Sequence, residues 1–314
     1  MTLVAHDRLV PARWREEQLP WITVAAGRYL LEEELGRGGM GRVHRGWDPL
    51  LGRAVAIKLA SPRHSETAAS PRRALDTRAR EARLLREARV LARLSHGNVV
   101  RLLDAGREGE RAFLVMDLAP GQSLAAWLRQ PRELRQVLHV AARLARALEH
   151  VHAAGVVHRD LKPENVLVDE RGEPVLIDFG LALGTGLARE AEPGPAGTLP
   201  WMAPEQARGE LERVGPWSDV YGLGAVLYRS LGGCPPHEAD SPWSLLLEVA
   251  SGPSPSLAAR CPFLDPALSG LVDRCLANDP QARPGAGEVA EELERLLRPS
   301  RRRWSSRLLR RLLG

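Results

Sequence analysis

The pattern of apolar and polar positions changes character about one third of the way along the chain. Residues 29–60 carry short runs rich in Val, Ile and Leu around a glycine-rich turn, which is typical of β-strands. Two further strand-like runs follow, with the sequences VVRLLDAG and AFLVMDLA. From Gly121 onwards the apolar residues recur at helical spacing. The pattern there predicts helices over residues 123–129, 133–154, 217–231, 243–251, 265–277 and 286–298. A β-rich first part and a larger helical second part indicate an α+β fold with two lobes of unequal size.

Between the glycine-rich turn and the later strands lies a segment with a different composition. Residues 61–80 are rich in Ser, Arg, Ala and Pro, which predicts a flexible connection, and a helical pattern follows from about Arg78 to Leu94. A harmless loop insertion is the simpler interpretation of this connection. A regulatory segment is the alternative, because the connection offers the hydroxyl groups of Ser61, Ser65, Thr67, Ser70 and Thr77.

Composition narrows the class of protein. A chain of 314 residues with 44% hydrophobic content can bury a sizeable core, and no apolar run is long enough to span a bilayer. The polar, charged N-terminus does not resemble a secretory signal. The three cysteines are widely spaced, which favours buried thiols in a reducing cytoplasm. The nine histidines show no zinc-ligand spacing, and we interpret His150 and His152 as structural.

The basic residues are unevenly distributed. Lysine and arginine together number 44, and only Lys58 and Lys162 are lysines, which leaves 42 arginines. The net charge is +5, but residues 299–314 hold six arginines and no acid, so the rest of the chain carries 38 basic and 39 acidic residues. This near-neutral body removes the electrostatic support for nucleic-acid binding. Because lysine is a compact point charge and arginine a wide planar fork, the two lysines indicate sites that arginine does not suit.

The arginine-rich C-terminal segment has an amphipathic pattern. Read as a helix, it places Trp304 and four leucines on one side and arginines on the other. This pattern is typical of an interfacial helix attracted to anionic lipid, at the inner face of the membrane. A disordered basic arm and a helix that packs on the main domain are the alternatives. The first 28 residues form an extension without an informative pattern.

A glycine-rich motif lies between two of the predicted strands. Gly36, Gly38 and Gly41 form a GxGxxG pattern, which also occurs in dinucleotide-binding folds, where a helix follows it. Here Val43 and His44 continue into a strand, which disfavours that fold. A glycine-rich hairpin can instead lay its backbone N–H groups over the phosphates of ATP without side-chain clash.

The next motif supplies the first lysine. The strand sequence VAIK ends at Lys58, whose ammonium group can reach nucleotide phosphates if a carboxylate holds it in place. The preferred carboxylate is Glu87 on the following helix, because a turn with His96 and Asn98 follows it at a suitable distance. Glu81, six residues earlier, is the alternative.

The most specific motif is HRDLKPEN, which contains the second lysine. Asp160 would accept or orient the proton of an attacking hydroxyl, and Lys162 would neutralise charge on a transferring phosphoryl group. Asn165 and the Asp178 of a following DFG sequence supply hard oxygen ligands for a magnesium ion. Each motif alone could be an ordinary turn, but their order after the glycine hairpin and VAIK makes coincidence negligible.

These motifs together resemble those of the eukaryotic-like serine/threonine protein kinases of bacteria. The resemblance implies a bilobal protein kinase fold, with a small antiparallel β-rich N-lobe that contains one main helix and a larger, mainly helical C-lobe. It implies an N-lobe at about 29–118, a C-lobe at about 119–298 and a basic tail at 299–314, with 29–298 as the catalytic domain. ATP and Mg²⁺, with Mn²⁺ as an alternative, would be the cofactors, and proteins with Ser or Thr acceptors the substrates.

The resemblance also assigns expected positions around the nucleotide. Val43 and Ala56 would cover the adenine from above and Leu167 from below. Met116 would be the gatekeeper, followed by a hinge. The complete expected set of ATP-binding residues is Leu35, Gly36, Gly38, Gly41, Val43, Ala56, Lys58, Glu87, Met116, Asp117, Leu118 and Leu167.

The segment that ends in APE resembles the end of a kinase activation segment. Thr198 would contact both Asp160 and Lys162. This threonine and Lys162 together indicate Ser or Thr, rather than Tyr, as the acceptor residue. By the same resemblance, Glu205 would pair with Arg283. Asp219 would hold the backbone of the catalytic loop, a structural role.

Two departures from the family pattern concern this segment. Trp201 stands where tyrosine or phenylalanine is usual, so we expect a reshaped substrate groove. Arg159 directly precedes the catalytic aspartate. An arginine at this position often accompanies activation by phosphorylation of the activation loop. Thr185 is the ordinary candidate for that modification, and the acids Glu190 and Glu192 could substitute for a phosphate, so we expect weak dependence on it.

Three other functions remain as alternatives. A pseudokinase would bind nucleotide without turnover, but the lysine, both aspartates, the asparagine and the loop glycines are all present. A small-molecule phosphotransferase shares the metal chemistry but lacks the segment that receives a peptide. A lipid-targeted adaptor would rely on residues 299–314. Oligomeric state and upstream signal have no sequence signature here.

Overall fold

The computed structural model describes residues 23–25, 27–38, 41–60, 71–108, 111–180, 182–184 and 198–298. These residues divide into two compact units. The first contains the described residues up to Arg93 together with Val100–Ala119, and the second contains Leu94–Val99 and the described residues from Pro120 onwards. The first unit is β-rich and the second helical, as the sequence predicted.

The short segment Leu94–Val99 belongs to the second unit, although it lies well before the boundary predicted near residue 118. Its backbone explains this placement. Leu176 N donates to Asn98 O at 2.8 Å, and Asn98 Nδ2 donates to Pro174 O at 2.7 Å. These bonds fasten the segment to a strand of the second unit.

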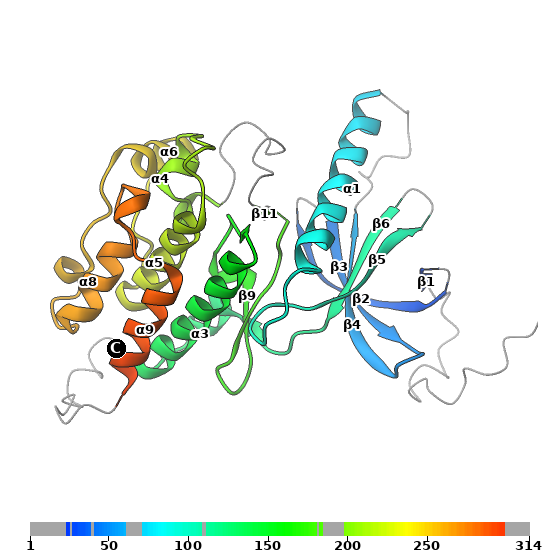
Figure 1. Ribbon diagram of the computed structural model, residues 1–314, viewed down its shortest axis with the longest axis horizontal. Coiled ribbons are helices and arrows are strands. Elements are labelled where there is room, and N and C mark those ends of the chain that lie inside the picture. Colours follow the sequence, from blue (N-terminus) through cyan, green and yellow to red (C-terminus); the bar gives the residue numbers. More distant parts are fainter. Residues whose placement is uncertain are drawn as a thin grey trace, which may run out of the picture. The chain divides into compact units, whose positions relative to one another are not determined.

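One antiparallel sheet dominates the described part of the first unit. Its order is β1-β2-β3-β4-β6-β5, and each strand pairs antiparallel with its neighbour (Figure 1). The strands are β1 (Thr23–Val24), β2 (Tyr29–Gly38), β3 (Gly41–Asp48), β4 (Arg53–Ala60), β5 (Leu102–Glu108) and β6 (Arg111–Asp117). Tyr29, Val55, Ile57, Phe113 and Val115 form a buried cluster on this sheet. Because each of these apolar side chains loses contact with water, the cluster stabilises the sheet.

Helix α1 (Pro71–Leu91) packs against β4, β5 and β6. It begins at Pro71, so the predicted flexible connection over residues 61–80 is wrong for its second half. Proline suits the first turn of a helix, where its missing N–H would have no partner in any case. The Arg, Ala and Leu residues that follow are good helix formers, although their composition suggested a loop.

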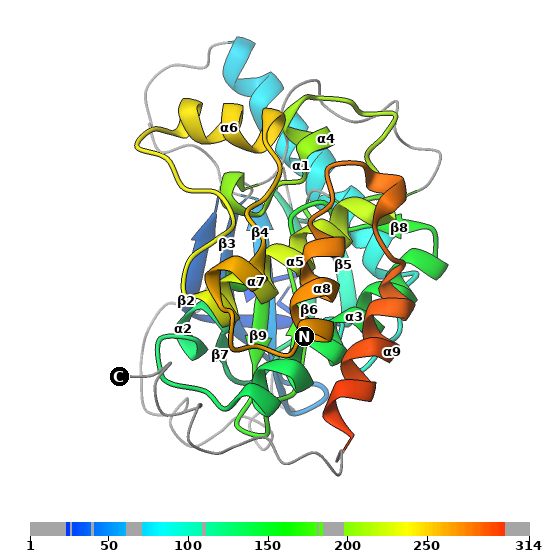
Figure 2. The ribbon, with the colours of Figure 1, turned by 90° about the vertical axis from the view of Figure 1, so that its left-hand side faces the viewer.

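The second unit is built on helices. They are α2 (Leu124–Trp127), α3 (Leu134–Ala153), α4 (Pro204–Ala207), α5 (Pro216–Gly232), α6 (Pro242–Ser251), α7 (Leu257–Arg260), α8 (Pro266–Cys275) and α9 (Ala286–Leu297). Helix α3 packs along α9, as Figure 2 shows, and it also packs against α5. The six helical segments predicted from periodicity are confirmed with small shifts at their ends. The short α4 and α7 were not predicted from the sequence.

Short strands and turns complete the second unit, and several of the residues predicted to act on the nucleotide lie on or beside them. Strands β7 (Gln122–Ser123), β9 (Val166–Val168) and β10 (Pro174–Leu176) form one small sheet, and β8 (Val156–Val157) pairs with β11 (Leu183–Gly184). The 3₁₀ turns are η2 (Pro163–Asn165), η4 (Leu199–Trp201) and η5 (Pro280–Ala282). Among the described residues, no helix is long and apolar enough to cross a membrane.

Candidate active site

The glycine-rich hairpin joins β2 and β3 in the first unit. Gly36 pairs with Val43, and Gly38 with Gly41, and residues 39 and 40 lie outside the described part. A Cβ at Gly41 would lie 2.1 Å from Leu59 O, so packing on β4 requires glycine there. A Cβ on Gly36 would meet no protein atom within 4 Å, so packing within the protein does not explain that glycine. The open space beside Gly36 fits a backbone that a ligand approaches closely.

Lys58 forms a buried ion pair with Glu87. Its Nζ lies 2.9 Å from Glu87 Oε1 and 2.8 Å from Oε2, and the two side chains are only 7% and 1% exposed. The alternative carboxylate, Glu81, instead pairs with Arg107 at 2.8 Å. The expected pairing of Lys58 with Glu87 is therefore present. A pair this deeply buried holds the ammonium in one position, since either charge alone would be costly to bury.

The residues expected around adenine fall in both units. Ala56 of β4 pairs with Met116 of β6, and Met116 is buried. Asp117 ends β6, where its N donates to Arg101 O at 3.0 Å. Leu118 follows and is half-buried, and Leu35 is 48% exposed. In the second unit, Leu167 of β9 is half-buried and pairs with both β10 and β7.

A fully buried carboxylate fixes the catalytic loop. Asp219 of α5 accepts hydrogen bonds from His158 N at 2.8 Å, from Arg159 N at 2.7 Å and from His152 Nε2 at 2.8 Å. Burial alone would raise the pKa of Asp219, but the bond from His152 and the neighbouring histidines outweigh it and lower that pKa. Arg159 has a φ of 68°, a left-handed conformation that is unfavourable for a residue other than glycine. The bonds to Asp219 hold the loop in that conformation.

The side chains expected to take part in phosphoryl transfer lie just after the residues that Asp219 holds. Lys162 Nζ donates to Asp160 Oδ2 at 2.6 Å and to Thr198 Oγ1 at 2.7 Å. Thr198 Oγ1 in turn donates to Asp160 Oδ1 at 2.9 Å. The contacts expected for Thr198 are therefore present. One carboxylate, one ammonium and one hydroxyl thus form a polar cluster in which each group bonds to the other two, and the Asp160 side chain is 11% exposed.

Asn165 joins the same cluster and suits a metal ion. Its Nδ2 donates to Asp160 O at 2.8 Å and to Asp160 Oδ2 at 3.1 Å, which leaves the carbonyl oxygen of the amide to face a cation. Ile177 N donates to Asn165 O at 2.8 Å, so the chain that leads to Asp178 runs beside Asn165. Asp178 has a φ of 61°. An amide oxygen and a carboxylate form a hard-oxygen donor set, which fits a small divalent cation that keeps other ligands from water and phosphate.

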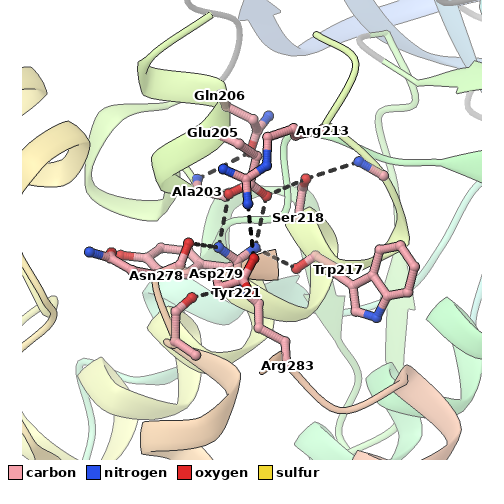
Figure 3. A network of polar contacts seen from close by, with 12 residues as sticks. Ala203, Glu205, Gln206, Arg213, Trp217, Ser218, Tyr221, Asn278, Asp279 and Arg283 are labelled. Atoms are coloured by element: carbon pink, nitrogen blue, oxygen red, sulfur yellow. Dashed lines mark hydrogen bonds and ion pairs between the residues drawn. The ribbon is translucent and has the colours of Figure 1, made fainter. Parts of the chain in front are cut away.

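The segment beyond Thr198 is locked by a second buried ion pair (Figure 3). Both oxygens of Glu205 accept from Arg283, each at 2.8 Å, and both side chains are fully buried. Ser218 Oγ adds a bond to Glu205 at 2.7 Å, and Arg283 also donates to Trp217 O at 2.9 Å. The expected pairing of Glu205 with Arg283 is present. The network includes Glu205 from α4, Trp217 and Ser218 from α5, and Arg283, which directly follows η5. It therefore connects three parts of the chain that are distant in sequence.

Sequence reasoning missed two connections. His152 was interpreted as structural, and its partner, which the sequence did not indicate, is Asp219, the aspartate that anchors the catalytic loop. Gln206 Nε2 donates to Arg159 O at 2.8 Å and so links α4 to the same loop. No sequence pattern marks either residue, although His152 does lie in the last turn of the helix that precedes the loop. Trp201, which replaces the usual tyrosine or phenylalanine, is buried, with the Arg229 guanidinium 5.8 Å from its ring centre.

Several expectations fall outside the described residues. They concern the phosphorylation candidate Thr185, the acids Glu190 and Glu192, residues 1–22 of the N-terminal extension, residues 61–70 and the tail over residues 299–314. The three cysteines are free thiols, and burial raises the pKa of Cys275 to about 12. That thiol therefore stays protonated and unreactive at neutral pH.

A glycine hairpin, a lysine–glutamate pair, and a cluster of Asp160, Lys162 and Asn165 with Thr198 from a later segment are features of the protein kinase class. The chain belongs to the protein kinase family: the family model for the protein kinase domain matches residues 29–293. Members of this family use ATP and a divalent metal and act on proteins.

Curated relatives of the chain are bacterial serine/threonine-protein kinases. The chain is 41% identical over 283 residues to the DNA damage-responsive serine/threonine-protein kinase RqkA of Deinococcus radiodurans, covering 88% of this chain and 40% of RqkA. It is 35% identical over 303 residues to PknD of Mycobacterium tuberculosis, covering 94% of this chain and 43% of PknD. It is 34% identical over 285 residues to PknA of the same species, covering 88% of this chain and 63% of PknA. The chain thus spans less than two thirds of the length of these relatives.

Proposed function

We propose that this chain transfers the γ-phosphoryl group of ATP to serine and threonine hydroxyls of protein substrates. The observation that carries the proposal is the cluster around Asp160, in which Lys162, Thr198 and Asn165 all contact one partly exposed carboxylate. This is the arrangement that phosphoryl transfer requires: a carboxylate to orient the acceptor and a cation to balance the transferring charge.

Each side chain of the cluster has a separate task. Asp160 orients the acceptor hydroxyl and accepts its proton as the new O–P bond forms. Lys162 stabilises the charge of the transferring phosphoryl group. Asn165 and Asp178 would hold Mg²⁺, with Mn²⁺ as the alternative. The bound cation would neutralise charge on the phosphate oxygens.

The first unit positions the nucleotide. Lys58, held by Glu87, would bind the α- and β-phosphates under the glycine hairpin. Its exposure of only 7% supports a role in positioning rather than in proton transfer. The remaining nucleotide contacts are proposed for Leu35, Gly36, Gly38, Gly41, Val43, Ala56, Met116, Asp117, Leu118 and Leu167.

The acceptor preference rests on Lys162 and Thr198. Their mutual bond of 2.7 Å beside Asp160 is the contact expected for the threonine and lysine that together support serine or threonine as the acceptor. The segment from Thr198 to Glu205, locked by Arg283, supports a protein rather than a small molecule as the substrate.

An autophosphorylation assay with labelled ATP and Mg²⁺ tests the proposal. The wild-type chain should label itself or an acceptor protein on Ser or Thr, and Asp160→Asn should lower the rate by about 10²–10⁴-fold. Mass-spectrometric mapping identifies the modified residues. Equal labelling of both proteins would overturn the assignment of Asp160. Nucleotide binding without labelling by the wild type would indicate a pseudokinase.

Three further points stay proposals. We propose a catalytic domain over residues 29–298. We also propose that it is located in the cytoplasm and that its activity depends only weakly on phosphorylation of Thr185.

The six arginines within residues 299–314 support peripheral contact with anionic lipid. Co-sedimentation with anionic vesicles should fall when these residues are deleted, and unchanged co-sedimentation would contradict the membrane contact.

A further inference from the structure

A cavity of about 850 Å³ lies within the second unit. Its wall comes from three places: the start of α3 with the segment before it, the turn between β9 and β10, and Leu297 at the end of α9. The described lining contains none of the residues proposed above for ATP, metal or catalysis. The volume lies within the usual range for ligand pockets, so the cavity is a second place where a small ligand could bind.

Three arginines line this cavity. Arg132 precedes α3, Arg135 lies in the first turn of α3, and Arg171 lies in the turn between β9 and β10. Within the described part of the chain, no carboxylate forms an ion pair with any of the three. An anion that enters the cavity would therefore meet guanidinium groups whose charge is not already neutralised by a partner.

Arg132 is held in place by neutral partners. Its Nε donates to Trp127 O at 2.9 Å, and its Nη2 donates to Gln130 Oε1 at 3.3 Å. The guanidinium carbon lies 4.4 Å from the centre of the buried Trp127 ring. These contacts fix the position of the cation and leave its charge available, so an anion would not have to order this side chain when it binds.

Two neutral side chains of the wall also offer donors rather than acceptors. Gln130 Oε1 accepts the bond from Arg132, and Gln136 Oε1 accepts from Glu133 N at 3.0 Å. Because both amide oxygens are already engaged, the amide NH₂ groups are what these side chains can offer to a ligand. The wall therefore suits a ligand with several acceptor oxygens.

Two acids also line the cavity, but they do not outweigh the three arginines. Asp169 is committed to its own turn, where its Oδ1 accepts from Arg171 N at 2.9 Å and from Glu173 N at 2.8 Å. Glu170 is exposed, so solvent and salt screen its charge. The charged side chains of the wall thus favour an anion over a cation.

The start of α3 adds to this positive potential. Over the described helix of 20 residues, the first turn contains Arg135 and no acid, and Glu133 precedes that turn as the N-cap residue. The free N–H groups at a helix start carry partial positive charge, so an arginine there is electrostatically unfavourable by itself. A bound anion would make the same arrangement favourable, because the helix start and the arginine would both attract it.

We propose that this cavity binds a phosphate group that is carried by a small molecule or by a lipid headgroup. The oxygens of a phosphate group can accept from several guanidinium and amide donors at once, which matches the wall. The volume leaves room for the polar body that carries the phosphate. The segment with six arginines begins two residues after Leu297 and attracts the same class of anion. Binding at this site does not depend on the proposed kinase activity.

Isothermal titration calorimetry with inorganic phosphate tests the soluble source. The full chain is titrated in the presence of Mg²⁺ and a saturating non-hydrolysable ATP analogue, so that the nucleotide site is already occupied. The wild type should bind phosphate saturably. The double variant Arg135→Gln/Arg171→Gln should bind it about tenfold or more weakly, because bonds to charged groups are lost. Both arginines are exposed, so their replacement should leave the thermal unfolding midpoint unchanged.

The matched control is Arg129→Gln. Arg129 is also exposed and lies close to Arg132 in the sequence, but it does not line the cavity. This variant removes one positive charge from the same region of the chain and should bind phosphate as the wild type does.

Co-sedimentation with vesicles tests the lipid source. Vesicles of phosphatidylcholine, with and without phosphatidylglycerol, are offered to the same three proteins, all of which keep residues 299–314. If the headgroup binds in the cavity, the double variant should co-sediment less with the phosphatidylglycerol vesicles than the wild type and Arg129→Gln do. A loss that is confined to the double variant in either experiment supports the proposal and identifies the source.

Two results would overturn the inference. One is equal binding, or equal lack of binding, by all three proteins in both experiments. The other is a loss in Arg129→Gln as large as the loss in the double variant, which would indicate general charge attraction without a site. Either result would leave the proposed kinase activity intact.

Discussion

The two lysines of this chain occupy two different kinds of site. Lys58 in the first unit is 7% exposed and meets both oxygens of Glu87 on a helix 29 residues further along. Lys162 in the second unit is 20% exposed and shares its ammonium between Asp160 and the Thr198 hydroxyl. One site is a sealed ion pair, and the other is an open cluster with a carboxylate that a substrate can reach.

The difference separates positioning from chemistry. A sealed pair resists displacement because each charge depends on the other in a dry environment. An open cluster keeps its groups available to accept a proton or to balance charge as it develops. The pair should therefore matter most for stability and nucleotide position, and the cluster for the rate of the chemical step.

The largest effect is expected from removing the carboxylate of the buried Lys58–Glu87 ion pair. Glu87→Ala should lower the free energy of unfolding by about 3–5 kcal/mol, because Lys58 is left buried without its carboxylate. The double variant Lys58→Met/Glu87→Leu should recover most of that stability and still lack activity. Urea unfolding and kinase assays on the same samples measure both. A matched control is Arg37→Ala, whose pair with Glu34 is exposed and should change the free energy of unfolding only slightly. A double variant that stays as unstable as Glu87→Ala would contradict the account.

A smaller effect is expected from the open cluster. Thr198→Val removes the hydroxyl that bonds to Lys162 and Asp160, and bonds to charged groups contribute about 1.5–3 kcal/mol. The expected result is a 10- to 100-fold lower kcat with little change in the KM for ATP. Thr198→Ser keeps the hydroxyl and should retain most of the activity. Steady-state kinetics at varied ATP would contradict this interpretation if KM rose while kcat stayed constant.

The smallest effect is expected from removing the hydrogen bond between His152 and Asp219, the aspartate that holds the catalytic loop. His152→Leu removes one of three donors to Asp219 and leaves the two from the catalytic loop, and one hydrogen bond to a charged group contributes about 1.5–3 kcal/mol. We expect a lower kcat at an unchanged KM for ATP. His152→Gln supplies an amide N–H and should restore part of the rate. Equal rates for the Leu and Gln variants would mean that the hydrogen bond does not position the loop.

The sequence predicted the local chemistry better than the supporting contacts. Each motif is a short run whose residues act on neighbouring atoms, so Asp160, Lys162 and Asn165 could be placed together without a structure. The choice of Glu87 over Glu81 relied on spacing, and the structure explains it. The two residues lie six positions apart on one helix, so they point in different directions, and Glu81 faces Arg107.

The contacts that were missed join residues far apart in the chain. His150 and His152 point to different faces of their helix: His150 Nε2 accepts from Ser95 N at 3.3 Å, whereas His152 reaches Asp219. Which partner each face meets depends on how α3 and α5 pack, and periodicity carries no such information. The start of α1 at Pro71 was missed because a Ser- and Arg-rich composition resembles a loop, although its residues tolerate a helix.

The central claim is that the two lysines perform different tasks that arginine cannot take over. Its most direct test compares Lys58→Arg with Lys162→Arg by the dissociation constant for ATP and the single-turnover rate at saturating ATP and Mg²⁺. We predict that Lys58→Arg loses most activity and binds ATP more weakly, because a wide guanidinium misplaces the phosphates. We predict that Lys162→Arg binds ATP normally and reacts about 100-fold more slowly. Wild-type turnover in both variants would contradict the claim.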